Sequence, residues 1–200
     1  MKPSSFKTLL GISSSTPEDI SILCDLYISV RQRNLVFHFL VLLYELTLLS
    51  ILSINSSTIF IRPRATIYFF AYLSLIIATL LVTILQYLWR NPSQKKLLWS
   101  LRAEHTYLAF LSFWSVVVTL NDQLGGNGLS VYTYSLLFIS ILSLAKPWQT
   151  SLLFFLDFLL LNLLLPYFPD PNGFNHIYNN FINSLALSGT AAVITYALYN

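Results

Sequence analysis

The stretch "TIYFFAYLSLIIATLLVTILQYLWRNPSQKK", Thr66 to Lys96, decides the fold class of this chain. It has no charged residue before Arg90, and basic residues and a proline follow immediately. The apolar part is longer than the roughly 20 residues that a helix needs to cross the hydrocarbon core of a bilayer. The stretch therefore predicts a membrane-spanning helix that ends in a basic loop.

The composition of the whole chain is that of an integral membrane protein. Of its 200 residues, 56% are hydrophobic and only 10% are charged, and the mean hydropathy is +0.66. The surface of a soluble domain carries more charge than this. Nucleic-acid binding requires a basic face, and the sequence shows none. We therefore expect the lipid bilayer as the surroundings of the chain and no nucleic acid as its partner.

Six apolar runs predict an all-α integral membrane bundle of six transmembrane helices. Each run is long enough, or nearly long enough, to cross the membrane. Loop-like segments such as "DQLGGNG" and "FPDPNGFNH" separate them. The predicted spans are residues 35–55, 65–89, 105–121, 129–145, 149–168 and 177–199.

The distribution of basic residues predicts the orientation of this bundle. With six spans both termini share one side of the membrane, and nine of the eleven Lys and Arg residues fall on that side. Because cytoplasmic loops carry an excess of Lys and Arg, both termini are predicted to be cytoplasmic. The nine residues are Lys2, Lys7, Arg31, Arg33, Arg90, Lys95, Lys96, Arg102 and Lys146; Arg62 and Arg64 lie on the other side.

A helix is expected to begin before the first span. Thr16 is suited to the N-cap and Pro17 to the first helical position, and two acidic residues follow at the positive end of the helix dipole. Apolar residues then recur at three- and four-residue spacing. We divide the chain into a flexible cytoplasmic N-terminus, 1–16, a cytoplasmic amphipathic helix on the membrane surface, 17–34, and the membrane domain, 35–200. Alternatively, 17–34 simply extends the first span.

Several polar residues are predicted to lie in or near the outer third of the membrane. Together they offer hydrogen-bond donors, acceptors and aromatic walls, which is the mixture that orients a small molecule in a pocket between helices. Alternatively, the Asp and Gln residues end the third span, the glycines of "LGGNG" form a turn, and the Asn and Tyr side chains bond one another. The candidate ligand-binding residues are Asp122, Gln123, Tyr132, Tyr134, Asn180 and Asn183.

Two acidic residues, Glu45 and Asp157, fall near the middle of predicted spans. A charge at that depth costs at least about 2.5 kcal/mol, and no Lys or Arg lies within the spans to pair with them. We expect these groups to be protonated or hydrogen-bonded, for example to the indole of Trp114. They serve either as contacts between helices or as proton carriers or ligand contacts. His38, on the same helical face as Glu45, is predicted to be an interface residue.

The sixth predicted span is rich in small residues. Ser184, Ser188 and Ala192 repeat at four-residue spacing and allow another helix to approach closely. That helix belongs either to the same chain or to a second subunit. We predict a homodimer in which the sixth span is the output element. Since "YALYN" ends the chain without a polar tail, we also expect a cytoplasmic output domain after Asn200.

The sequence contains no recognisable catalytic motif. "LGGNG" lacks the Gly-Lys-Ser/Thr ending of a phosphate-binding loop. HExxH, GxSxG and paired metal-ligating cysteines are all absent. We therefore predict no catalytic residue, no metal site and no cofactor within these 200 residues.

Residues 30–200 resemble the six-span N-terminal membrane regions of bacterial GGDEF proteins, the diguanylate cyclases. The similar segments are "TLNDQ", "VYTYSLL" and "NNFINSLALSGTAAVITYALYN". The resemblance implies a location in a bacterial cytoplasmic membrane, a sensory pocket at Asp122, Gln123, Tyr132 and Asn183, and a cytoplasmic diguanylate cyclase domain that makes cyclic di-GMP. The GGDEF motif itself is absent, so the resemblance assigns no catalytic residue.

Three functions remain open at this point. The first is a sensory membrane domain that binds a small molecule near the outer face and signals through its last helix. The second is a small proton-coupled transporter or channel that uses Glu45 and Asp157, although no inverted repeat is evident. The third is a ligand-free anchor that dimerises an enzyme.

Overall fold

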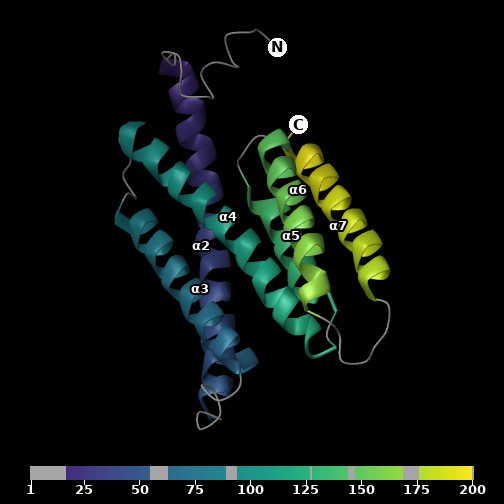
Figure 1. Ribbon diagram of the computed structural model, residues 1–200. Coiled ribbons are helices and arrows are strands. Elements are labelled where there is room, and N and C mark those ends of the chain that lie inside the picture. The colour runs from purple at the N-terminus through teal and green to yellow at the C-terminus, as the bar shows by residue number, and fades with distance from the viewer. Residues whose placement is uncertain are drawn as a thin grey trace.

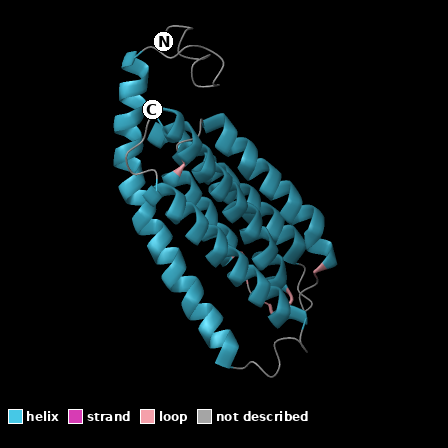
Figure 2. Cartoon of the chain, turned by 90° about the vertical axis from the view of Figure 1, so that its left-hand side faces the viewer, coloured by secondary structure: helices cyan, strands magenta, loops and turns pink. Residues whose placement is uncertain are grey.

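The protein folds as a bundle of helices. The structure is a computed structural model that describes residues 17–54, 63–88, 94–126, 128–143, 147–168 and 176–199. Side-chain surroundings are described within 31–54, 63–88, 99–126, 128–143, 147–168 and 179–198. The regular structure in these residues is entirely helical and includes no strand (Figure 2). The predicted all-α fold class is therefore confirmed.

Each of the six apolar runs coincides with one helix of the described chain. The fifth helix continues into a short 3-10 turn, η2. The elements are α2 Pro17–Ile54, α3 Pro63–Leu88, α4 Gln94–Gln123, α5 Ser130–Leu142, α6 Pro147–Leu164, η2 Leu165–Tyr167 and α7 His176–Tyr199.

Proline marks the first residue of three helices. α2 begins at Pro17, α3 at Pro63 and α6 at Pro147. The fixed φ of proline suits the first helical turn. Proline lacks a backbone N–H, and at this position an N–H would have no acceptor within the helix. From Pro17, α2 runs to Ile54 without a break. Segment 17–34 and the first apolar run thus belong to one continuous helix.

Successive helices run in opposite directions along the bundle. α2 begins and α7 ends at the same end, which we call the termini end (Figure 1). The turn between α4 and α5 lies at the other end, the far end. α4 occupies the centre, because it packs against α2, α3, α5 and α6, while α7 packs against α5 and α6.

Four helices in the described chain are long and apolar enough to cross a membrane. They are Arg31–Ile54 within α2, Pro63–Leu88, Pro147–Tyr167 and Asn179–Leu198. α5 is apolar but has only 13 residues, about 20 Å of helix, which is short of a hydrocarbon core of about 30 Å. α4 is long but less apolar. Its central position explains this, since buried Ser112, Ser115 and Thr119 face protein neighbours.

The distribution of side chains between inside and outside fits a membrane protein. Large apolar residues point outward on every side, among them Phe39, Leu81, Leu163 and Val193. Many polar side chains are buried instead. Apolar surface on this scale is typical of a protein that contacts lipid.

Candidate ligand-binding cavity

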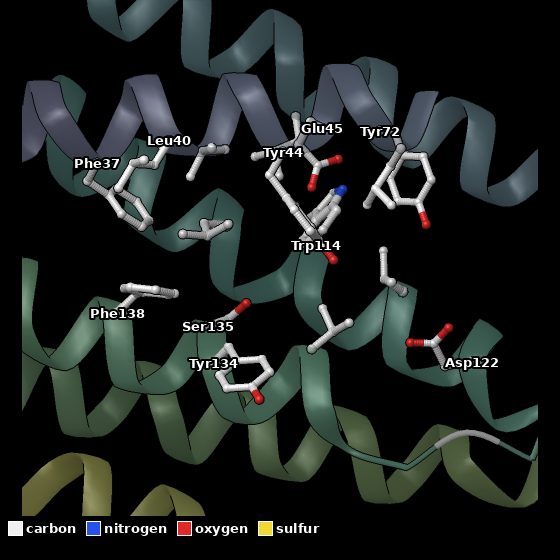
Figure 3. A pocket seen from close by; sticks show the side chains of 16 residues that line it. Phe37, Leu40, Tyr44, Glu45, Tyr72, Trp114, Asp122, Tyr134, Ser135 and Phe138 are labelled. Carbon is white, nitrogen blue, oxygen red and sulfur yellow. The ribbon is translucent and has the colours of Figure 1, made fainter. Parts of the chain in front are cut away.

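A cavity of about 570 Å³ lies between α2, α3, α4 and α5. It is a slot that runs along α2, with Phe37 and Phe138 at one end and Tyr72 and Asp122 at the other (Figure 3). The rings of Phe37 and Phe138 lie 5.0 Å apart between centroids and bring α2 and α5 together there. The volume falls in the range of pockets that hold small organic molecules.

Glu45 lies in the middle of this slot. Glu45 is only 1% exposed, and its Oε2 atom has no hydrogen-bond partner among the described residues. The sixteen residues that line the slot include no Lys, Arg or His. Glu45 therefore presents a buried carboxyl group to a cavity that offers it no basic partner.

Trp114 also lines the slot, but its indole N–H does not donate to Glu45. Its indole Nε1 donates a hydrogen bond to the backbone carbonyl of Ala71, at 2.8 Å. The donor considered for Glu45 or Asp157 from the sequence is thus engaged between α4 and α3. Trp114 contributes aromatic surface to the slot.

Asp122 lies at one end of the slot, and α4 ends directly after it in a glycine-containing turn. Tyr68 donates a hydrogen bond to Asp122 Oδ1. Arg64 Nη1 donates to the carbonyl oxygen of Leu124, at 3.1 Å, and a Cβ atom at Gly125 would require this flexible side chain to shift. Gly126 has φ of 74°, a left-handed conformation that commonly ends helices. The segment thus forms a helix terminus and lines one end of a cavity.

The six candidate ligand-binding residues do not all converge. Asp122 and Tyr134 line the slot. Gln123 accepts a hydrogen bond from Asn180, at 2.9 Å, which links α4 to α7 outside the slot. The Tyr132 hydroxyl bonds Ser188, at 2.9 Å, which links α5 to α7.

Asn183 has a different position from Asn180. It is exposed on α7, and it is not among the residues that line the slot. The structure therefore brings two of the candidates to the cavity, uses three in contacts between helices, and leaves one on the surface.

Asp157 lies apart from the cavity. It is fully buried on α6, and its Oδ2 atom accepts a hydrogen bond from Ser112 of α4. The two acidic residues found near the middle of predicted spans are thus in different surroundings.

The small-residue face of α7 packs within the chain. Ser184 and Ser188 are buried, and Ala192 is half-buried. Asn162 of α6 donates to Ser184 Oγ, at 3.0 Å, while Ser188 bonds Tyr132 as described above. The helices that pack against this face, α5 and α6, belong to the same chain.

Sequence reasoning missed a second buried group, which we call the Glu104 cluster: Asn34, His38, Gln86 and Glu104. Asn34 donates to Glu104 Oε1 at 2.8 Å, Gln86 donates to Oε2, and His38 Nε2 lies 3.2 Å from Oε1. All four residues are at most 3% exposed. Asn34 and His38 are four residues apart on the face of α2 that also carries Glu45. In the sequence, this row of polar residues on one face of an apolar helix could have indicated a buried polar cluster.

Comparison with protein-family profiles, with curated proteins and with solved structures gives no match to this chain.

Proposed function

We propose that this chain is a membrane-embedded sensory domain that binds a small molecule in the slot between α2 and α5. The observation that carries the proposal is Glu45, a buried residue that faces a cavity of about 570 Å³ and whose Oε2 atom has no hydrogen-bond partner among the described residues. A ligand-free membrane anchor would be more stable without this cavity, because empty space and unsatisfied polar atoms both destabilise a fold.

The contacts of α5 provide a path from the slot to α7. Val131, Tyr134, Ser135 and Phe138 of α5 line the slot, and Tyr132 on another face of the same helix bonds Ser188 of α7. A ligand that favours one position of α5 would therefore also favour one position of α7. Such coupling requires that the two positions bind the ligand with different affinity.

The proposed membrane arrangement has six spans, with the termini end at the cytoplasmic side. Arg31 and Arg33 of α2 and Arg102 of α4 lie toward the termini end, and Arg64 lies at the far end, as the positive-inside rule requires. α4 takes part as a central span, which is largely buried among its neighbours but keeps one apolar face with exposed Phe110, Phe113 and Val117.

The proposed output is a cytoplasmic enzyme domain of the diguanylate cyclase type, joined after α7. This part of the proposal rests on the resemblance of "TLNDQ" and the last span to membrane regions of GGDEF proteins. We also propose a homodimer, since such enzymes join two half-sites. Because the small-residue face of α7 is occupied within the chain, the dimer contact would use its exposed face, which includes Leu185, Val193 and Tyr196.

Filling the slot tests the sensory proposal. Ser135 is buried on its wall, so Ser135→Phe should occupy the space that a ligand needs. Ser130→Phe is the matched control, because Ser130 is exposed on the same helix and does not line the slot. Compounds that raise the midpoint of thermal unfolding of the purified chain should lose this effect in Ser135→Phe and keep it in Ser130→Phe.

Two outcomes would contradict the proposal. If the compounds stabilise both variants equally, the slot is not their binding site. If a compound that binds the slot also crosses the membrane of proteoliposomes in a chain-dependent and proton-driven manner, the transporter alternative is favoured.

A further inference from the structure

The charged side chains that line the slot are all acidic. Its lining contains two carboxyl groups, Glu45 and Asp122, and no basic side chain. Asp122 already accepts a hydrogen bond from Tyr68, whereas Glu45 Oε2 has no partner among the described residues. A buried carboxylate without a partner is unfavourable, and a positive group in the cavity would relieve this cost. The slot therefore favours a cation.

Aromatic residues surround the same space. Tyr44, Tyr72, Trp114 and Tyr134 all contribute to the lining (Figure 3). The faces of such rings attract organic cations, and tryptophan does so most strongly. The indole N–H of Trp114 is already bonded to Ala71, so this residue offers its ring surface and no free donor. The walls are therefore suited to an ammonium group that carries organic substituents.

The slot opens on the side of the bundle. Leu40 and Tyr44 on α2, and Tyr134 and Phe138 on α5, line it and are each about half exposed or more. α2 is one of the four helices able to span a membrane. An opening between α2 and α5 at this level would face lipid, so a ligand could enter from the apolar phase of the membrane.

We propose that the slot binds a lipophilic organic cation, a protonated or quaternary amine with an apolar body, whose positive group contacts Glu45. This inference rests on the proposed function and names the ligand class of the same site. The lining of α2 extends from Phe37 to Leu48, about 16 Å of helix, which suits an elongated molecule. The amine is either a free compound dissolved in the membrane or the headgroup of an amine-containing phospholipid.

Matched fluorescent probes test the ligand class. The full chain would be placed in nanodiscs of digalactosyldiacylglycerol, a neutral lipid without nitrogen. Trimethylammonium-diphenylhexatriene is the cationic probe, and diphenylhexatriene and its propionic acid derivative are the neutral and anionic ones. The readout is saturable quenching of tryptophan fluorescence. The cation should bind at least about tenfold more tightly than the neutral probe, because hydrogen bonds to charged groups are the stronger ones. The anion should show no saturable binding.

Two carboxyl variants locate the charge. Glu45→Gln keeps the shape of the side chain and should weaken binding of the cation at least about tenfold, with binding of the neutral probe unchanged. Asp157→Asn is the matched control, since Asp157 is also buried but does not line the slot. It should leave binding of the cation within about twofold of the original. The probe comparison on the unaltered chain needs no variant, so it decides the question even if Glu45→Gln fails to fold.

The outcomes separate this inference from the proposed function. If the cationic and neutral probes bind equally and both are lost in Ser135→Phe, the slot is a ligand site and the preference for a cation is wrong. If none of the three probes shows saturable binding, the inference fails, and the comparison of Ser135→Phe with Ser130→Phe decides the proposed function separately. Added phosphatidylethanolamine should weaken cation binding if the headgroup is the natural occupant, and should have no effect if the occupant is a free amine.

Discussion

The Glu104 cluster and the slot around Glu45 occupy successive levels between the same helices, α2, α3 and α4, yet they are built in opposite ways. Glu104 meets donors from Asn34 and Gln86 and lies 3.2 Å from His38. Two helical turns along α2 from His38, Glu45 meets a cavity and no described partner. Polar side chains contact one another around Glu104, whereas a cavity lies beside Glu45.

This difference separates stability from binding. A buried acid that is surrounded by donors helps to hold three helices in register. A buried acid beside empty space contributes little to the fold, because it neither packs tightly nor pairs. Asp157 is intermediate, with one hydrogen bond from Ser112. The three buried acids thus form a series in which the stability cost of removal should follow the number of partners.

The largest effect is expected at Glu104. Glu104→Ala would leave the amides of Asn34 and Gln86 buried without their common acceptor and would remove the carboxyl group 3.2 Å from His38, so the loss should be about 3–5 kcal/mol in the free energy of unfolding. Reversible unfolding by SDS in mixed micelles, followed by far-UV circular dichroism, would measure it. Glu104→Gln keeps an oxygen acceptor and should lose less. A loss below about 1 kcal/mol in Glu104→Ala would mean that the cluster does not hold the helices together.

The positions of the helices could be predicted from the sequence, but their rotation could not. Each of the six apolar runs lies on one helix, and the expected start at Pro17 is observed. Asn180 and Asn183 were placed at similar depth, yet Asn180 is buried against Gln123 and Asn183 is exposed. Three residues along a helix change the direction of a side chain by about 60°, and only packing decides which direction is inside.

The cavity could be predicted only in part, for a related reason. Glu45, Asp122 and Tyr134 were singled out as polar or aromatic residues in the membrane, but their meeting at one slot depends on how α2, α4 and α5 pack. Glu104 was overlooked because it precedes the third predicted span by one residue. Its partners on α2 and α3 are far away in sequence, and no local pattern connects them.

An intermediate effect is expected at Asp157. Asp157→Ala removes the acceptor of the Ser112 hydroxyl, which is fully buried on α4. The hydroxyl can turn to a backbone carbonyl of its own helix, so the loss should be about 1–2 kcal/mol in the same unfolding experiment. Asp157→Asn retains an oxygen acceptor and serves as the control. A loss as large as that of Glu104→Ala would break the proposed series.

The smallest effect on stability is expected at Glu45. Glu45→Gln preserves the shape of the side chain and removes no described hydrogen bond, so the free energy of unfolding without ligand should change by less than about 0.5 kcal/mol. The effect should instead appear with ligand present. At 100 times its dissociation constant, a ligand that binds only the folded state stabilises it by about 2.7 kcal/mol.

A tenfold weaker site at the same concentration of trimethylammonium-diphenylhexatriene would provide only about 1.4 kcal/mol. Measuring the unfolding of both forms of the chain with and without this probe gives the four free energies required. If Glu45→Gln loses more than about 2 kcal/mol without probe, Glu45 has a structural partner, and the contrast with Glu104 no longer holds. If only the stabilisation by probe falls, the group contributes to binding and adds little to the fold, which is the behaviour that an open slot beside a filled polar cluster predicts.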